Sequence, residues 1–347
     1  MDKIPVLVTG IGGGGHGEQI IKALRLGKLS YNIIGTDITT FCSSRAIVDK
    51  FYEIPLVSSS SYLTIILDIC KKYKVKAVFH GSEQEMMFFS EHRKYFEDIG
   101  IYLPVNSKYT LDICQNKSKT MEHLNKLGFE TPKFIEITKQ STCEFGEPPF
   151  IVKPSIGGGG SSNVFIAQDY EELRLITKYI LKYSKKILIQ EYIGTPDKEF
   201  TVGVLFGKDG HLINSIAVKR IIENALSRRM SILNNTNKEN LGTHLVVSSG
   251  VSSGEIGRWS YVTKPCEVIA KSLKPIAPIN IQCRQVNNKI IPFEINPRFS
   301  GTTSLRAIVG YNEPDVLIRR DVFGEEIKDH FSYNESTIMR GLQEYEI

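Results

Sequence analysis

The feature that most restricts the fold of this 347-residue chain is a glycine-rich turn close to its start. Residues 4–8 read IPVLV, which predicts a short buried strand, and the turn TGIGGGGHG follows at once. An apolar segment at 19–26 predicts a helix, and a second strand then leads to Asp37, about twenty residues beyond the glycines. This order is typical of a βαβ unit in a parallel sheet, so we expect a Rossmann-like domain over residues 1–115.

The function of this turn stays open between two interpretations. In a dinucleotide-binding domain the glycines admit a phosphate to the N-terminus of the next helix, which would indicate an NAD(P)- or flavin-dependent oxidoreductase. A lone glycine fingerprint is weak, however, because any doubly wound sheet needs a tight crossing from strand to helix. The amides of Gly13 and Gly14 could hold a substrate carboxylate as well as a phosphate.

Polar residues follow a later strand of the same domain, predicted over 75–79. Ser82, Glu83 and Glu85 stand just after its carboxyl end, where parallel sheets bind their ligands, and they could recognise a substrate amine. The alternative is a capping box, in which Ser82 and Glu85 together open a helix. Both roles can hold at once.

A second glycine-rich segment lies between two apolar strands, predicted over 150–153 and 164–166. Ordering four consecutive glycines costs backbone entropy, so we expect their amides to approach phosphate oxygens and to close over a ligand. The segment is not a P-loop, because no lysine follows the glycines; instead Lys153 precedes them. A flexible hairpin without function is the alternative. The residues expected in this loop are Gly157, Gly158, Gly159, Gly160, Ser161 and Ser162.

A third pattern predicts an antiparallel hairpin. Residues 280–284 alternate like a half-buried strand, 287–289 form a tight turn, and 290–295 return as a second strand. One carboxylate with two amide oxygens suits Mg²⁺ better than Zn²⁺, and Arg298 beside them could offer its fork to a phosphoryl oxygen. An ordinary polar hairpin is the alternative. The expected oxygen ligands are Gln282, Glu294 and Asn296.

A hydroxyl-rich turn at 299–303 leads into a helix predicted over 304–309. An oxyanion or carboxylate could rest on its amides, with Arg284 and Arg306 nearby. A further helix is predicted over 315–323, and the last dozen residues predict a closing strand without chemistry. The turn residues expected to bind substrate are Ser300, Gly301 and Thr302.

Composition excludes several classes of protein. A net charge of +5, 41% apolar and 23% charged residues are ordinary for a globular protein, and no basic run favours nucleic acid. Six cysteines without a CxxC pair argue against a zinc knuckle or a disulfide framework. No segment has transmembrane length and no signal peptide is recognisable, so we expect a cytoplasmic protein that binds no membrane. The polar segment 234–255 predicts a mobile loop.

Four motifs stand in the order and spacing of the ATP-grasp superfamily: Lys117, the 150–153 strand with its glycine loop, Gln190–Ile193 with Glu199, and Gln282 to Arg298. The chain resembles a single ATP-grasp unit of the carbamoyl phosphate synthase large subunit and the stand-alone carboxylate–amine ligases. The resemblance implies a mixed α/β and α+β fold, in which the Rossmann-like domain precedes a two-lobed ATP-grasp fold. The small lobe with the glycine loop would span 116–190, and the large lobe with the metal site 191–347.

The resemblance also implies how ATP is bound. Lys117 and Lys153 would contact the phosphates, and Glu199 the ribose hydroxyls. The oxygen ligands of the hairpin would hold Mg²⁺, for which Mn²⁺ could substitute, with Glu294 as the bridge between two ions. The hinge that holds adenine would consist of Glu191, Tyr192 and Ile193, and Gln190 just before it would also belong to the ATP site.

For catalysis the resemblance singles out Lys153 and Arg298, with Arg298 steadying the transferred phosphoryl group. The family also places an arginine at the γ-phosphate or the substrate carboxylate, and both Arg220 and Arg228 are candidates. We favour Arg220 because it ends a strand, although a solvated basic face would explain either residue.

The implied activity is ATP-dependent joining of a small carboxylate, such as an amino acid, to an amine or a thiol through an acyl phosphate. One unit cannot be a complete carbamoyl phosphate synthase, which carries two, yet phosphorylation of bicarbonate or carbamate stays open as a second hypothesis. The oxidoreductase is a third hypothesis, and an ATP-binding module without catalysis is a fourth. A homodimer is left open.

Overall fold

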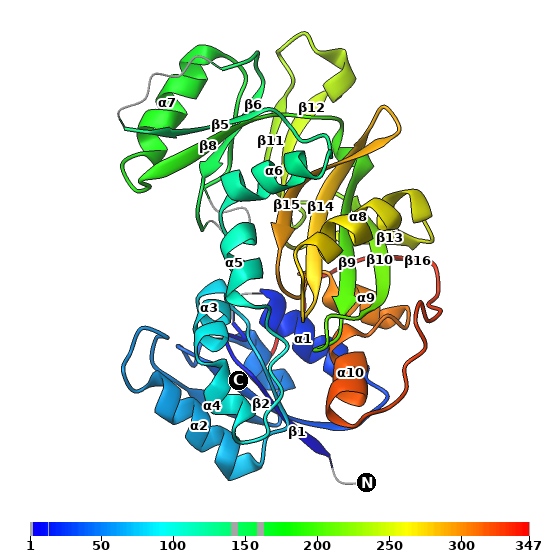
Figure 1. Cartoon of the computed structure of the whole chain (residues 1–347). Helices are drawn as coiled ribbons and strands as arrows, with labels where there is room; N and C mark the ends of the chain where they lie inside the picture. Colours follow the sequence, from blue (N-terminus) through cyan, green and yellow to red (C-terminus); the bar gives the residue numbers. More distant parts are fainter. Residues whose placement is uncertain (1–2, 13, 140–144, 158–162, 347) are drawn as a thin grey trace.

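A computed structural model describes residues 3–12, 14–139, 145–157 and 163–346 of the chain. The strands form three larger sheets and one two-stranded ribbon, and the N-terminal sheet lies below the other two in Figure 1. This organisation confirms the predicted mixed α/β fold. The bounds of the three predicted domains remain predictions.

The N-terminal sheet is parallel, with the strand order β3-β2-β1-β4. The predicted βαβ unit is present, and its helix α1 begins directly after the glycine turn, at His16. Because β1 lies between β2 and β4, the segments that follow β1 and β4 leave the sheet side by side, where such sheets bind ligands. Its elements are β1 (Ile4–Val8), α1 (His16–Arg25), β2 (Tyr31–Asp37), a 3₁₀ turn (Ser43–Ile47), β3 (Lys50–Glu53), α2 (Tyr62–Tyr73), β4 (Ala77–Phe79), α3 (Glu83–Glu91) and α4 (Arg93–Glu97).

The second sheet is antiparallel, with the order β5-β8-β6-β7. Helix α7 covers it through Leu173 and Ile180, which pack on Phe150 and Val152. Two helices, α5 and α6, lead into this sheet from the N-terminal part (Figure 1). The elements are α5 (Lys108–Cys114), α6 (Lys117–Lys126), β5 (Phe134–Thr138), β6 (Phe150–Pro154), β7 (Phe165–Ala167), α7 (Tyr170–Ile180) and β8 (Lys186–Glu191).

The largest sheet has six strands in the order β15-β14-β9-β10-β13-β16. The predicted hairpin is confirmed: β14 and β15 are antiparallel, and Asn287 and Asn288 turn between them at φ 47° and 61°, as a type I′ turn requires. Helix α8 covers one face of this sheet. The elements are a 3₁₀ turn (Pro196–Lys198), β9 (Glu199–Phe206), β10 (Leu212–Ile221), β13 (Ser253–Gly257), α8 (Ser260–Ser272), β14 (Ile279–Val286), β15 (Lys289–Asn296) and β16 (Ser336–Ile338).

The structure corrects the prediction of a mobile loop over 234–255. After a 3₁₀ turn (Glu239–Leu241), strand β12 (His244–Ser248) pairs with β11 (Arg228–Leu233), and β13 joins the large sheet. The three apolar residues Leu245–Val247 are buried in β12, and they outweigh the polar composition around them. The predicted closing strand is also shorter than expected, because only Ser336–Ile338 pairs.

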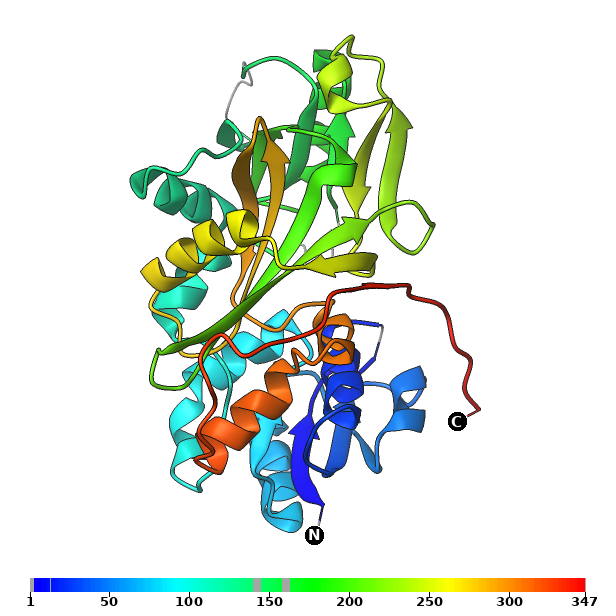
Figure 2. The ribbon, with the colours of Figure 1, turned by 90° about the vertical axis from the view of Figure 1, so that its right-hand side faces the viewer.

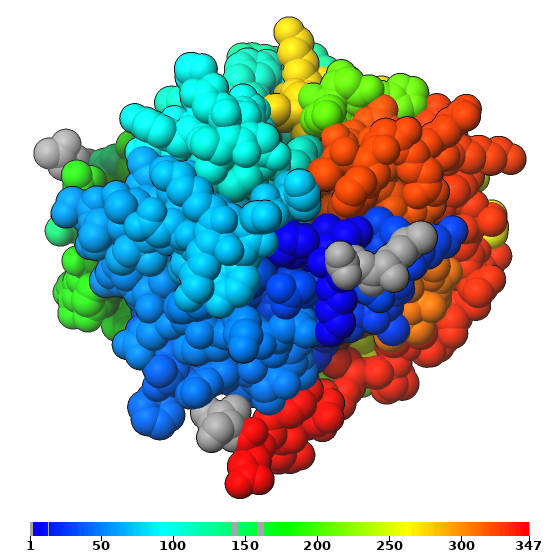
Figure 3. All heavy atoms as spheres, turned by 90° about the horizontal axis from the view of Figure 1, so that it is seen from below, coloured from blue at the N-terminus to red at the C-terminus, as the bar shows by residue number. Residues whose placement is uncertain are grey.

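The C-terminal helices lie between the N-terminal sheet and the large sheet that they follow, and they pack on both. Helices α9 (Thr303–Ile308) and α10 (Glu313–Leu317) pack on α1, and a π-helical turn (Ile318–Val322) continues α10. Their side chains share one apolar core with β1, α1 and β10, and Figure 2 shows the two helices beside the N-terminal elements. Seen from below, this orange segment borders the blue N-terminal residues (Figure 3). Among the described helices none has both the length and the apolarity that crossing a membrane requires.

A buried ion pair anchors α9 and α10. Arg306 Nη1 lies 3.1 Å from Glu313 Oε1, both side chains are about 1% exposed, and Arg306 Nη2 donates to Asn280 Oδ1 at 2.7 Å. Gly203 on β9 makes room for the guanidinium, because a Cβ there would lie 2.2 Å from Arg306 Nη1. The pair therefore joins the C-terminal helices to the underside of β9 and β14.

Replacing Glu313 by alanine should lower the free energy of unfolding by about 3–5 kcal/mol, because Arg306 would stay buried without a counter-charge. Urea denaturation followed by the fluorescence of the single tryptophan, Trp259, measures this change. Asp98→Ala, which breaks the exposed pair between Lys94 and Asp98, should leave the midpoint unchanged. An unchanged midpoint for Glu313→Ala would contradict the anchoring role.

Candidate functional site

One pocket gathers most of the residues that the sequence assigned to ATP. It opens between the second sheet and the large sheet. Its predicted members are Lys117, Lys153, Gln190, Glu191, Tyr192, Ile193, Glu199, Gln282 and Glu294. Apolar side chains of Ile151, Val164, Val246, Val247 and Phe293 line the remainder.

Two lysines form the basic end of this pocket. Lys153 is buried, and its Nζ donates to Gln190 Oε1 at 2.9 Å; Lys117 Nζ donates to the carbonyl of Gly157 at 2.5 Å. Burial lowers the pKa of Lys153 to about 8; the carboxylate of Glu294 opposes this shift, and the charge of Lys117 adds to it. Lys153 is therefore mainly protonated at pH 7, but it can lose its proton at mildly alkaline pH.

The predicted oxygen ligands of the hairpin lie close to these lysines: Glu294 lines the pocket with both of them, and Glu294 and Asn296 line a smaller pocket with Lys117. Gln282 on β14 pairs with Glu294 on β15, and Asn296 Nδ2 donates to Glu294 Oε1 at 3.1 Å. Asn296 Oδ1 in turn accepts a hydrogen bond from Arg298 Nη2 at 3.1 Å. Within the described ranges no group of three or more His, Cys, Asp or Glu residues could hold a metal. One carboxylate with two amides fits a Mg²⁺ ion that takes its other oxygens from phosphate and water.

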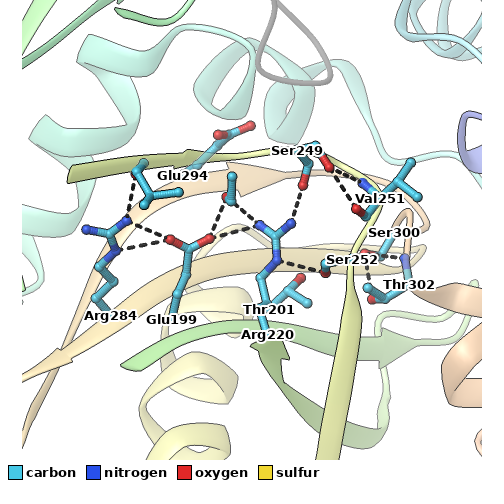
Figure 4. Close-up of polar contacts among 12 residues, drawn as sticks. Glu199, Thr201, Arg220, Ser249, Val251, Ser252, Arg284, Glu294, Ser300 and Thr302 are labelled. Atoms are coloured by element: carbon cyan, nitrogen blue, oxygen red, sulfur yellow. Dashed lines mark hydrogen bonds and ion pairs between the residues drawn. The ribbon is translucent and has the colours of Figure 1, made fainter. Parts of the chain in front are cut away.

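Glu199 sits between two arginines at the floor of the site (Figure 4). Its Oε1 accepts from Arg220 Nη1 at 2.9 Å and from Ser248 Oγ at 2.6 Å, and its Oε2 accepts from Arg284 Nε at 3.0 Å and Nη2 at 2.9 Å. Burial alone would raise the pKa of Glu199, but the two guanidiniums outweigh burial and hold it below the ordinary value. The carboxylate is thus ionised and fully hydrogen-bonded within the protein.

The two candidate arginines lie in different surroundings. Arg220 is buried beside Glu199, whereas Arg228 is exposed and donates to backbone carbonyls of 223–224. The structure also places Arg284 away from the turn at 299–303, near which the sequence predicted it (Figure 4). That residue lies over the ring of Tyr192 at 4.7 Å, and Figure 4 shows it at the other end of the row from Ser300 and Thr302.

The turn at 299–303 satisfies two of its own amides. Ser300 N donates to Thr303 Oγ1 at 3.1 Å, and Thr302 N donates to Ser300 Oγ at 3.1 Å. Gly301 fits closely against the carbonyl of Gly250, which a Cβ would approach to 2.3 Å. The amides of Ser300 and Thr302 are therefore not available for the oxyanion expected from the sequence, and Arg306 is directed to Glu313 instead.

The polar residues after β4 divide into two roles. Ser82 and Glu85 form the capping box: Glu85 N donates to Ser82 Oγ at 3.2 Å, and Ser82 Oγ donates to Glu85 Oε2 at 2.9 Å. Glu85 is buried and also accepts from Tyr62 at 2.7 Å, so it holds the fold together. Glu83 instead lines a smaller pocket together with Lys117 and Glu294. Of the three, Glu83 is the one that shares a pocket with Glu294 and Asn296.

The N-terminal glycine turn does not favour the oxidoreductase. Asp37 stands where a dinucleotide-binding domain keeps the acid for the ribose hydroxyl. Its Oδ2 instead accepts from Gly12 N at 2.7 Å, and its Oδ1 accepts from Ile38 N at 2.9 Å. Gly14 lies at φ 68° beside Glu18. The predicted site residues Gly13, Gly158, Gly159, Gly160, Ser161 and Ser162 lie outside the described residues.

Three residues near the site carried no prediction. His16 and His80 follow β1 and β4 and touch at 3.3 Å, between His16 Nε2 and His80 Nδ1. Burial and the charge of Arg298 lower the pKa of His80 to about 3, so the ring is neutral. Their position at the carboxyl ends of neighbouring strands could have identified both. The third, Arg340, had no local signal, because only the folded chain brings it to the turn at 299–303.

Comparison with known proteins agrees with this geometry. Residues 6–104 match the family described as PylC-like, N-terminal domain. The D-alanine–D-alanine ligase of Bacillus anthracis is 27% identical over 163 residues, which are 43% of this chain and 53% of that protein. The carbamoyl phosphate synthase large chain of Saccharolobus islandicus is 28% identical over 168 residues, 46% of this chain and 15% of that one. The chain thus spans about half the length, or less, of these curated relatives.

Among solved structures, the N5-carboxyaminoimidazole synthetase of Staphylococcus aureus in complex with ADP superposes with a TM-score of 0.64. It covers 96% of this chain and 81% of that one at 16% identity, so the likeness concerns the fold. Residues 114–302, more than half of the chain, match the family model described as ATP-grasp domain. The chain therefore belongs to the ATP-grasp domain family.

Proposed function

We propose that the protein is an ATP-dependent ligase that joins a small carboxylate to an amine or a thiol through an acyl phosphate. The observation that carries this proposal is the pocket whose lining brings Lys117 and Lys153 together with Glu294. A Mg-bound triphosphate needs cationic side chains and metal ligands around the same phosphate groups. The D-alanine–D-alanine ligase of B. anthracis supports the same class of reaction.

In this proposal ATP occupies the pocket with its base among the apolar residues. The hinge at 191–193 faces the adenine edge, and Lys117 and Lys153 bind the phosphates. Glu199 reaches the ribose only through a shared hydrogen bond, because its four acceptor contacts are already made. Its main role is then to position Arg220 and Arg284 around the nucleotide.

The first chemical step transfers the γ-phosphoryl group. A carboxylate oxygen of the substrate forms a bond to the γ-phosphorus while the bond to ADP breaks, so ADP leaves. Mg²⁺, when bound, would stabilise the negative charge on the oxygens of the phosphoryl group during its transfer. The side chains of Gln282, Glu294 and Asn296 are the ones that would hold it. Arg298, fixed by Asn296 Oδ1, is placed to steady the same oxygens.

The second step forms the new bond. The amine nitrogen attacks the carbonyl carbon of the acyl phosphate, the bond to the phosphate oxygen breaks, and inorganic phosphate leaves. A proton must leave the attacking nitrogen, and Glu83 is the carboxylate that faces this region from the N-terminal part. We therefore assign Glu83 the binding of the amine and the acceptance of its proton.

The direct test is a screen of phosphate release with Mg-ATP. Small carboxylates and amino acids are supplied alone and in pairs with amines, thiols or bicarbonate. Phosphate release should require both an acid and an acceptor, because the acyl phosphate discharges only when the acceptor attacks it. Stimulation by bicarbonate alone would indicate the carbamoyl-phosphate-like reaction, and no stimulation by any pair would contradict the ligase.

Glu294→Ala should reduce kcat at least about 1000-fold, since the metal supplies several kcal/mol of charge stabilisation in such reactions. The matched control is Glu130→Ala. Glu130 contacts Lys289 at the far end of the same hairpin and is 56% exposed. The activity of Glu130→Ala should equal that of the wild type. Wild-type activity of Glu294→Ala would show that the hairpin takes no part in the reaction.

The affinity for Mg-ATP should fall as the pH rises above about 8, because Lys153 then loses the proton that binds phosphate. One unit above the pKa only about a tenth of the lysine remains charged. Equilibrium titration with Mg-ATP from pH 6.5 to 9.5 measures this dependence. In Lys153→Arg the guanidinium stays charged, so the affinity should no longer change over that range. A wild-type profile as flat as that of the variant would exclude the role of Lys153.

A further inference from the structure

Two arginines at the turn 299–303, Arg298 and Arg340, lack the carboxylate partner that other arginines in the interior have. Arg220 and Arg284 pair with Glu199, Arg306 pairs with Glu313, and Arg319 pairs with Asp315 and Glu325. In the part of the chain that the structure describes, no carboxylate lies within ion-pair distance of Arg298 or Arg340. Both arginines contact the turn at 299–303.

Their hydrogen bonds hold this turn from both ends. Arg298 Nη1 donates to the carbonyl of Phe299 at 3.0 Å. Arg340 Nη2 donates to the carbonyl of Gly301 at 2.8 Å and to Ser304 Oγ at 3.4 Å. These contacts leave Arg298 Nε and Arg340 Nη1 buried without a hydrogen-bond partner among the described residues. Unpaired buried donors are rare in folded proteins, so each calls for a physical reason.

Strand β16 brings Arg340 to this place. Ile338 pairs with Gly254 of β13, and the amide of Arg340 itself donates to Ser253 Oγ at 2.9 Å. The nearest acid in electrostatic range is Glu18 on α1, but Glu18 forms its ion pair with Lys22 on the same helix. Burial lowers the pKa of Arg340 to about 10, so its guanidinium is still charged at pH 7.

A charged guanidinium with an unused, buried donor is unfavourable in the free protein and favourable once an oxyanion binds. Two sources of an oxyanion exist in the proposed reaction: the transferred phosphoryl group and a carboxylate of the substrate. Arg298 contacts the proposed metal ligand Asn296, so we assign Arg298 to binding the phosphoryl group. Arg340 contacts the later part of the turn and α9, beside the start of α1, away from that ligand set.

We propose that Arg340 binds a carboxylate of the substrate that the reaction does not consume. This proposal rests on the ligase function and narrows its substrates to molecules with a carboxylate beyond the reacting group, such as amino acids and dicarboxylates. Arg340 is then a specificity-determining residue supplied by the C-terminal segment. Monocarboxylates without a second polar group would lack this anchor.

Equilibrium binding tests this assignment without turnover. The full chain is titrated with succinate and with L-glutamate, at constant ionic strength, in the presence of Mg-ADP. The dissociation constant should rise about 10- to 100-fold in Arg340→Gln, as expected for the loss of hydrogen bonds to a charged group. Succinamide, which has no carboxylate, should bind neither protein. The affinity for Mg-ADP should stay unchanged, since Arg340 does not line the nucleotide pocket.

The matched control is Arg258→Gln. Arg258 also fastens the C-terminal segment, through the carbonyl of Tyr333 at 2.7 Å and through Glu335, but it is 56% exposed and outside the site. Arg258→Gln should bind both anions like the wild type. This control separates the loss of the Arg340 guanidinium from a weakened attachment of the C-terminal segment. Arg340→Lys keeps the charge without the planar fork and decides the question if Arg340→Gln does not fold; it should weaken binding several-fold.

Inorganic phosphate is titrated in the same way as a comparison. Three results would overturn the proposal: no binding of either carboxylate by the wild type, equal binding by Arg340→Gln, or a loss of affinity confined to inorganic phosphate. The last would assign Arg340 to the transferred phosphoryl group. If no substrate pair stimulates phosphate release but anion binding depends on Arg340, then the ligase function fails and the anion site stands. The two failures are therefore distinguishable.

Discussion

The ion triad of Arg220, Glu199 and Arg284 is the interaction on which the geometry of the site depends. Glu199 stands at the start of the central strand β9, and its two partners stand on the neighbours β10 and β14. Arg284 reaches further to the carbonyl of Ile193, and Arg220 to Ser248 and Ser252. One carboxylate thus ties the large sheet to the hinge segment and to the ribbon that carries β12. Burying three charges is costly unless every lone pair and proton is satisfied, and here nearly all are.

The charged residues proposed to bind the nucleotide and its metal are different from those of the triad. The triad has two guanidiniums and one carboxylate and so keeps a net charge of +1, whereas Lys117 and Lys153 line the pocket together with Glu294. The lysines come from α6 and β6, and the acid comes from β15 of the other sheet. These three charged residues of the pocket therefore lie outside the triad. Such a division suits a site that has to admit a nucleotide and then enclose it.

Local patterns in the sequence predicted most of the fold. The βαβ unit and the hairpin of β14 and β15 follow from periodicity and turn residues, which act over a few neighbours. The segment 234–255 did not, because its strands β12 and β13 depend on pairing with distant strands, which composition does not reveal. Most of the residues that the family resemblance assigned to ATP line one pocket, and their binding roles remain predictions. Arg284 was misplaced, because its register opposite Glu199 is fixed only by the non-local pairing of β14 with β9.

The apolar core shared by α1 and the C-terminal helices has a consequence for how the chain folds during synthesis. Ile20 and Leu24 near the start of the chain pack in one cluster with Val309 and Leu317 near its end. The ribosome releases the first segment long before the last, so the N-terminal sheet emerges with one helix face uncovered. Its native packing has to wait for the final helices.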